Sequence, residues 1–69
     1  MSALYVYREN FLPNGNYVSL TRYESFLSDY EFSVSVFDME QLEDADLFTG
    51  TYEEAEAFYN KYLAEQKAA

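Results

Sequence analysis

The chain has 69 residues, of which 13 are Asp or Glu and four are Lys or Arg, so its formal net charge is −9 at neutral pH. It contains no His, Cys or Trp, which excludes disulfides, zinc ligation by imidazole or thiolate, and the usual general base and thiolate nucleophile of enzymes. A chain this short buries roughly 60% of its unfolded surface and has little material left for a catalytic cleft. We therefore expect a binding protein with no catalytic activity, no metal and no cofactor.

The composition is that of a folded protein, because 49% of the residues are hydrophobic and eight Tyr and six Phe are among them. Disordered acidic segments are poor in such residues. Uninterrupted apolar stretches are too short to cross a membrane. We expect one domain over residues 1–69, located in the cytoplasm.

Residues 3–9 are predicted to form a first strand, since aromatic and β-branched types that suit a pleated surface are frequent there. In such a strand Leu4 and Val6 share one face, and Tyr5 and Tyr7 share the other.

An Asn-Gly pair predicts a hairpin after the first strand. Asn14 and Gly15 both tolerate the positive φ of a type I′ turn. The second strand then begins near Asn16 and continues through Leu20, with Val18 and Leu20 facing inward.

Residues 21–30 carry conflicting signals. Thr21 and Glu24 have the spacing of a capping box, and residues at i, i+3, i+4 and i+7 form a helical stripe: Tyr23, Phe26, Leu27 and Tyr30. These signals predict a short helix. The alternative continues the second strand to about Glu24 and places a turn at residues 25–29.

Residues 31–38 alternate between apolar and polar side chains and predict a half-buried strand, with Phe32, Val34 and Val36 on one face. Residues 39–50 form an acidic connection that holds either a helical turn or a short edge strand. We expect its apolar residues to hold it against the core: Leu42, Leu47 and Phe48.

A C-terminal helix is predicted from Thr51 onward. Thr51 and Glu54 form a second capping box, and one apolar stripe follows at helical spacing: Ala55, Phe58, Tyr59, Tyr62 and Leu63. The predicted fold class is α+β, a small antiparallel sheet of about three strands with this helix packed on one face. If residues 21–30 form the predicted short helix, they add a second helix to this fold.

The charges are unevenly distributed along the sequence. Between Tyr23 and Asn60 there is no Lys or Arg, whereas eleven acidic residues occur there: Glu24, Asp29, Glu31, Asp38, Glu40, Glu43, Asp44, Asp46, Glu53, Glu54 and Glu56. Such a concentration of like charge opposes compaction and favours encounter with cationic surfaces. Eleven carboxylates equal the charge on about 19 Å of duplex DNA. We therefore predict that these residues bind a basic, DNA-binding protein surface.

Tyrosine is abundant enough that some hydroxyls should be exposed, with Tyr5, Tyr7, Tyr17 and Tyr30 as the candidates. Exposed Tyr is favoured at interface hot spots and stacks on Arg. We include Tyr5, Tyr7 and Tyr30 in the predicted binding surface, with burial in the core as the alternative for Tyr5 and Tyr7.

A calcium loop beginning at Asp44 and Asp46 is excluded by its spacing. An EF-hand needs an oxygen ligand, a Gly and a final Glu at the positions that Phe48, Thr49 and Ala55 occupy.

In its small size, strong acidity, high Tyr and Phe content and lack of Cys, the chain resembles the small acidic proteins that phages use against bacterial defence. These include anti-CRISPR and antirestriction proteins that mimic DNA, and the chain is most similar in style to type I anti-CRISPR proteins, with no shared motif. The resemblance implies stoichiometric inhibition in the host bacterial cytoplasm: the protein occupies a basic groove of a CRISPR-Cas effector subunit, and target DNA or its protospacer-adjacent motif is excluded. It implies no direct binding of nucleic acid.

The competing interpretation is a small acidic interaction module, either a monomer or a weak homodimer formed through an open sheet face or an edge strand. Such a contact would be mostly apolar and insensitive to salt.

Overall fold

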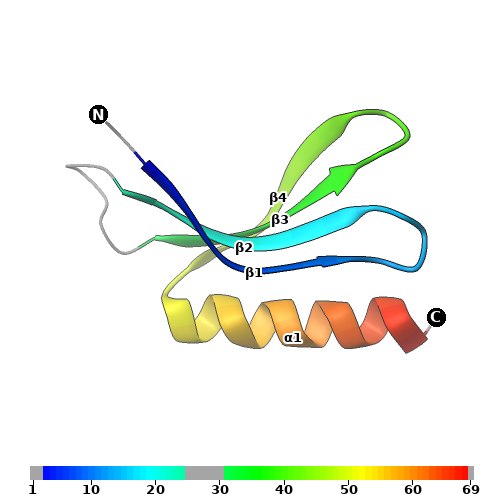
Figure 1. Ribbon diagram of the computed structural model, residues 1–69. Coiled ribbons are helices and arrows are strands. Elements are labelled where there is room, and N and C mark those ends of the chain that lie inside the picture. Colours follow the sequence, from blue (N-terminus) through cyan, green and yellow to red (C-terminus); the bar gives the residue numbers. More distant parts are fainter. Residues whose placement is uncertain (1–2, 25–30, 69) are drawn as a thin grey trace.

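Four antiparallel strands form one sheet in chain order, and a C-terminal helix packs on one of its faces (Figure 1). The computed structural model describes the backbone of residues 3–24 and 31–68 and the side chains of residues 4–22 and 31–68. The elements are β1 (Ala3–Phe11), β2 (Tyr17–Glu24), β3 (Phe32–Asp38), β4 (Glu43–Gly50) and α1 (Tyr52–Ala68). The predicted α+β fold is confirmed, with four strands in place of about three.

The β1–β2 hairpin turns where the Asn-Gly pair predicted, but with a different geometry. The Gly15 N–H donates to the Leu12 carbonyl at 2.8 Å, and the Leu12 N–H donates to the Asn16 carbonyl at 2.7 Å. Pro13 and Asn14 therefore occupy the centre of the turn, and only the following Gly15 takes a positive φ, of 91°. The predicted type I′ turn is wrong because proline, with its fixed φ, favours a type I turn followed by a left-handed glycine.

Strand β2 continues through Glu24, so the prediction of a helix beginning at Thr21 is wrong and the strand part of the alternative is confirmed. Thr21 pairs with Val6 on one side and with Ser33 on the other. These two ladders satisfy the backbone groups that a helix would have satisfied locally. The predicted turn at residues 25–29 lies outside the described residues.

The core lies between α1 and strands β2 and β3. Its fully or nearly buried side chains are Leu12, Val18, Leu20, Val34, Ala55 and Tyr59. Val18 and Leu20 face inward as predicted, and the predicted helical stripe packs on the sheet. Phe48 of β4 stacks on Phe58 of α1 with ring centroids 5.1 Å apart.

Helix α1 begins with the predicted capping box. The Glu54 N–H donates to Thr51 Oγ1 at 3.3 Å, and the Thr51 N–H donates to Glu54 Oε1 at 3.1 Å. This reciprocal pair satisfies backbone donors that the first turn leaves without intrahelical partners.

The acidic connection forms the edge strand β4, which resolves the two alternatives left open by the sequence. Of the three apolar residues expected to hold it on the core, Phe48 does so, whereas Leu42 is 70% exposed and Leu47 is 36% exposed. A register shift lies here, because Val34 pairs with Phe48 and Ser35 pairs with Asp46. Leu47 is the extra residue of this bulge and lies outside the regular alternation.

Candidate protein-binding surface

Five of the predicted acidic residues lie together on the β3–β4 hairpin. We call residues 38–46 the acidic hairpin; it contains Asp38, Glu40, Glu43, Asp44 and Asp46 and no Lys or Arg. Asp38 shapes its turn, because Asp38 Oδ1 accepts hydrogen bonds from the backbone N–H groups of Glu40, at 2.9 Å, and Gln41, at 3.1 Å. The turn is thereby closed by one of its own carboxylates.

Most of this charge is not compensated by the residues that the structure describes. Asp46 accepts a hydrogen bond from Ser35 Oγ at 2.8 Å. The side chains of Glu40, Glu43 and Asp44 are exposed and have no hydrogen bond or ion pair with any residue that the structure describes. Their charges are therefore available to a partner.

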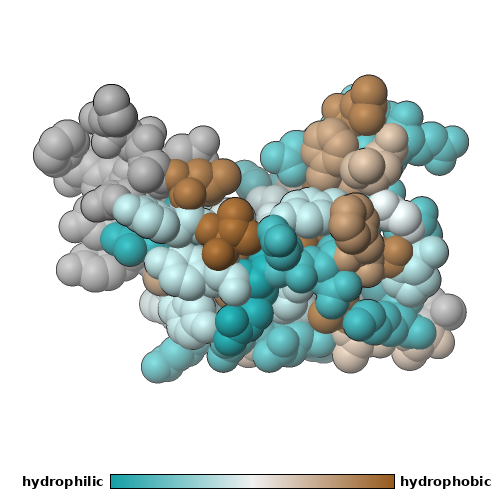
Figure 2. Space-filling view, in the orientation of Figure 1, coloured by the Kyte–Doolittle hydropathy of each residue, from teal (hydrophilic) through white to brown (hydrophobic). Residues whose placement is uncertain are grey.

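Hydrophobic side chains project from the same hairpin. Met39 is 49% exposed and Leu42 is 70% exposed, and Figure 2 shows hydrophobic residues among hydrophilic ones on the hairpin, which rises away from the rest of the sheet. Leu42 has a φ of 57°, the left-handed region. The hairpin is also joined to the β1–β2 loop, because the Met39 N–H donates to Asn16 Oδ1 at 3.3 Å.

The other predicted acidic residues that the structure describes do not join the acidic hairpin. They lie at the opposite end of β4, beside the start of β3 and the start of α1: Glu31, Glu53, Glu54 and Glu56. Glu54 serves in the helix cap, and Glu56 forms an ion pair with Arg8 at 3.0 Å. The side chains of Glu24 and Asp29 lie outside the described residues. The nine predicted carboxylates that the structure describes are therefore divided between two ends of the sheet.

The tyrosines predicted to join the surface lie elsewhere. Tyr5 and Tyr7 are 45% and 40% exposed, but β1 is the edge opposite β4. A bulge between Val6 and Arg8 lets both Tyr7 and Arg8 reach the helix side, where the Tyr7 ring lies 6.0 Å from that of Tyr52. Tyr30 lies outside the described residues.

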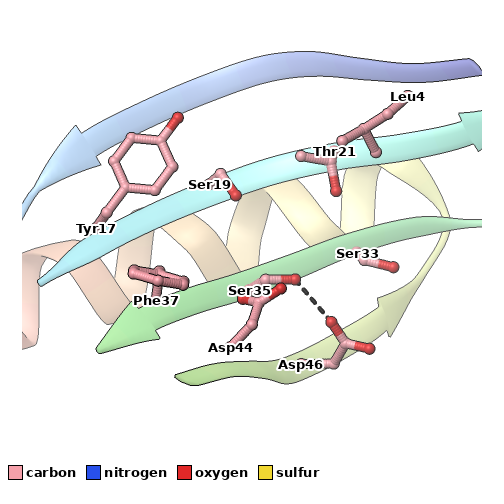
Figure 3. Close-up of a pocket in the computed structure, with 9 residues that line it drawn as sticks. All are labelled: Leu4, Tyr17, Ser19, Thr21, Ser33, Ser35, Phe37, Asp44 and Asp46. Carbon is pink, nitrogen blue, oxygen red and sulfur yellow. Dashed lines mark hydrogen bonds between the residues drawn. The ribbon is translucent and has the colours of Figure 1, made fainter. Parts of the chain in front are cut away.

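The sheet face that α1 leaves uncovered, the open face, is hollowed into a trough of about 510 Å³ lined by all four strands (Figure 3). Four Ser and Thr residues line its floor: Ser19, Thr21, Ser33 and Ser35. Two rings lie at one end and Leu4 at the other, and two carboxylates of the acidic hairpin form one side: Tyr17, Phe37, Asp44 and Asp46. We call this cavity the open-face trough.

A carboxylate also fixes the aromatic end of the open-face trough. The Tyr17 hydroxyl donates a hydrogen bond to Glu9 Oε2. This bond, with desolvation and the negative charge of Glu9, raises the pKa of Tyr17 to about 12. The hydrogen bond to Glu9 holds the Tyr17 ring in position.

Sequence reasoning missed the open-face trough, because it depends on the registers that bring Ser19 beside Ser35 and Thr21 beside Ser33. The alternation of residues 31–38 indicates which residues of one strand share a face, but not which residues of other strands lie beside them.

Neither a metal-ligand cluster nor a membrane-spanning helix is found in the described part of the chain. Residues 3–24 and 31–68 contain no group of three or more His, Cys, Asp or Glu arranged to hold a metal ion, and no helix there is long and apolar enough to cross a membrane. Comparisons with protein-family models, with curated proteins and with solved structures give no match. Function must therefore be inferred from the surface chemistry of this chain.

Proposed function

We propose that the protein is a stoichiometric inhibitor that binds a basic, nucleic-acid-binding surface of another protein through its acidic hairpin. The observation that carries this proposal is the presence of five carboxylates within residues 38–46, at an exposed edge of the sheet and without a Lys or Arg. A protein that needed only solubility could intersperse charges of both signs.

The size of the acidic hairpin matches a short nucleic-acid footprint. Five carboxylates carry the charge of roughly 9 Å of duplex DNA, a length of a few base pairs. Side chains at i and i+2 of β4, such as Asp44 and Asp46, project from the same face about 6.6 Å apart. Lys and Arg residues that normally contact phosphates can meet carboxylates at such spacing, and Arg can bind them in bidentate fashion.

As the target we propose the DNA-reading subunit of a type I CRISPR surveillance complex in a bacterial host, where the protein excludes target DNA or its protospacer-adjacent motif. Small size, acidity, aromatic content and the α+β fold support this choice. A DNA-binding restriction enzyme is the alternative target with the same chemistry.

The proposal is tested by adding the purified protein to a panel of type I surveillance complexes and measuring their binding to target DNA by mobility shift. We expect one complex to lose DNA binding at a stoichiometric ratio, with inhibition weakening as salt rises. A ternary complex of protein, surveillance complex and DNA, or undiminished DNA binding across CRISPR and restriction panels, would contradict the proposal.

Charge reversal tests the surface itself. In the triple variant Glu40→Lys, Glu43→Lys, Asp44→Lys we expect inhibition to be lost, because each residue is exposed and has no partner among the described residues. The matched control reverses three exposed acids elsewhere: Glu31→Lys, Glu53→Lys, Glu65→Lys. Both variants change the net charge equally. Equal loss in both would indicate an effect of net charge alone.

A second candidate function, a salt-insensitive interaction module or homodimer, is favoured by apolar side chains on β1. Leu4, Val6 and Phe11 are 52%, 50% and 61% exposed, and they lie on the open face in the observed register. Sedimentation at low and high salt separates the candidates: self-association that persists at high salt supports this one, whereas the inhibitor is monomeric at both.

A further inference from the structure

The open-face trough combines three chemical features that suit one ligand group. We propose that it binds the guanidinium group of an arginine side chain presented by the basic partner. This inference rests on the proposed function and assigns the residue type that the partner contributes. The cavity, of about 510 Å³, is large enough to admit a side chain together with part of its backbone segment.

The first feature is directed negative charge. Asp44 and Asp46 line the same side of the trough. The hydrogen bond from Ser35 Oγ, at 2.8 Å, occupies Asp46 Oδ1 and leaves Oδ2 without a described partner, while Asp44 has none on either oxygen. Both carboxylates can therefore accept charge-assisted hydrogen bonds. The trough has no Lys or Arg in its lining, so its charge selects a cation.

The second feature is a set of neutral acceptors. Ser19 faces Ser35 and Thr21 faces Ser33 across the β2–β3 ladder, so four hydroxyls form two adjacent rows on the open face (Figure 3). Guanidinium carries five N–H donors in one plane, whereas ammonium carries three on a compact centre. A flat array of hydroxyl and carboxylate oxygens is therefore better matched to arginine than to lysine.

The third feature is the aromatic end of the trough. Tyr17 and Phe37 are direct neighbours across the β2–β3 ladder, and the hydrogen bond to Glu9 fixes the Tyr17 ring. Guanidinium stacks on aromatic faces and gains cation–π attraction there. Carboxylates, hydroxyls and rings thus meet in one cavity.

The experiment uses two peptides of equal length and charge, tetra-arginine and tetra-lysine, titrated into the isotope-labelled protein and followed by amide chemical shifts. We expect tetra-arginine to shift resonances of residues lining the trough and to bind about threefold or more tightly than tetra-lysine, as cation–π attraction at a partly exposed site implies. Equal affinity for the two peptides, or shifts confined to residues outside the trough, would overturn the inference.

Matched variants separate the trough from general acidity. Asp44→Asn with Asp46→Asn removes two charges inside the trough, and Glu40→Gln with Glu43→Gln removes two charges outside it. We expect the first pair to weaken tetra-arginine binding about tenfold and the second pair no more than about twofold. The amide introduced by Asp46→Asn retains an oxygen that can accept the hydrogen bond from Ser35, so the fold is expected to persist, as amide dispersion would verify. Equal weakening of tetra-arginine binding by both pairs of substitutions would refute the proposal that arginine binds in the open-face trough.

Phe37→Leu keeps every charge and removes one ring. We expect the preference for tetra-arginine over tetra-lysine to become smaller but not to vanish, because the Tyr17 ring and the hydroxyls remain, while tetra-lysine binding is unchanged. These peptide outcomes are independent of the inhibition assay. If the charge-reversed acidic-hairpin variant loses inhibition but the unmodified protein binds both peptides equally, the proposed function is retained and arginine binding in the trough is refuted.

Discussion

At the scale of single residues, Leu42 stores backbone strain at the tip of the acidic hairpin. Its φ of 57° lies in the left-handed region, and its side chain is 70% exposed. That conformation costs a non-glycine residue roughly 1–2 kcal/mol. Because the Leu42 side chain buries little apolar area, hydrophobic burial offsets little of this cost. We therefore predict that Leu42→Gly raises the free energy of unfolding by about 1 kcal/mol, the relief of strain exceeding the entropy cost of glycine.

The measurement is urea unfolding with Leu42→Ala as the control. Alanine removes the side chain but keeps the strain, so its midpoint should stay close to that of the unmodified chain. A midpoint that rises equally for alanine and glycine would show that the leucine side chain, not its backbone, is the cause.

The raised pKa of Tyr17 predicts how the free energy of unfolding changes in alkaline solution. Its pKa is raised to about 12 by the hydrogen bond to Glu9, whereas an unfolded tyrosine titrates near 10. Because the folded pKa is the higher one, the folded chain keeps a proton that the unfolded chain loses. The stabilisation is complete below about pH 10 and is lost as pH rises toward about 12.

Phenolate absorbance during an alkaline titration measures this directly. In Tyr17→Phe we expect the loss of one late-titrating group and a shallower fall of stability above pH 10. The free energy of unfolding of this variant should still fall with pH above pH 10, because two other tyrosines also have raised pKa values in the folded chain. Glu56 raises the pKa of Tyr52 through a hydrogen bond, and burial raises the pKa of Tyr59. An unchanged titration in Tyr17→Phe would contradict the bond between Tyr17 and Glu9.

At the scale of elements, the start of α1 depends on its cap. Thr51 Oγ1 accepts the Glu54 N–H, and its own N–H reaches the Glu54 carboxylate. We predict that Thr51→Ala lowers the free energy of unfolding by about 1 kcal/mol, the usual cost of removing an N-cap hydroxyl. Thr51→Ser retains the hydroxyl and should restore most of the loss in thermal unfolding. If serine is as destabilising as alanine, the methyl group of threonine matters more than its hydroxyl.

Most features encoded by neighbouring residues were predicted correctly, whereas the full length of β2 and the form of residues 39–50 depend on pairing with distant residues and were not decided correctly from the sequence. The α1 cap and stripe are local, and so is the alternation of β3. The capping-box spacing of Thr21 and Glu24 is equally local, but pairing of Thr21 with Val6 and Ser33 overrode it. Strand β4 has no clear alternation because it is an exposed edge with a bulge at Leu47.

The candidate site shows the same division. The carboxylates of the acidic hairpin are adjacent in sequence, so their association could be predicted. Glu53 and Glu56 were predicted to join them, but β4 separates them along its full length. Tyr7 was assigned to the same surface, yet strand order places it at the far edge of the sheet, where a bulge turns it toward the helix.

Both sheet edges are poor templates for pairing with another strand. β1 carries a register shift between Val6 and Arg8, and β4 carries one opposite Val34 and Ser35. Bulges and charged side chains are devices by which edge strands avoid association. The acidic edge β4 would also repel a second copy of itself, which favours a partner of opposite charge over a homodimer built on that edge.

At the scale of the whole molecule, a net charge of −9 on 69 residues opposes folding and promotes binding to a cation-rich partner. Added salt should therefore raise the free energy of unfolding and lower the affinity for the partner. Within the described residues Arg8 pairs with Glu56, but Glu40, Glu43 and Asp44 have no such partner. Screening reduces their mutual repulsion in the folded chain more than in the expanded unfolded chain.

We therefore predict that raising NaCl to about 0.5 M increases the free energy of unfolding by about 1 kcal/mol while weakening inhibition of the target complex. The first effect is measured by urea unfolding, and the second by DNA mobility shift at the same salt concentrations. Neutralising Glu40 and Glu43 with glutamine should reduce the salt dependence of both, since both originate in the same charges. If the free energy of unfolding instead falls as salt rises, attractive ion pairs such as Arg8 with Glu56 dominate the electrostatics of the folded chain. That result would contradict the inference that the acidic hairpin carries uncompensated, mutually repelling charges.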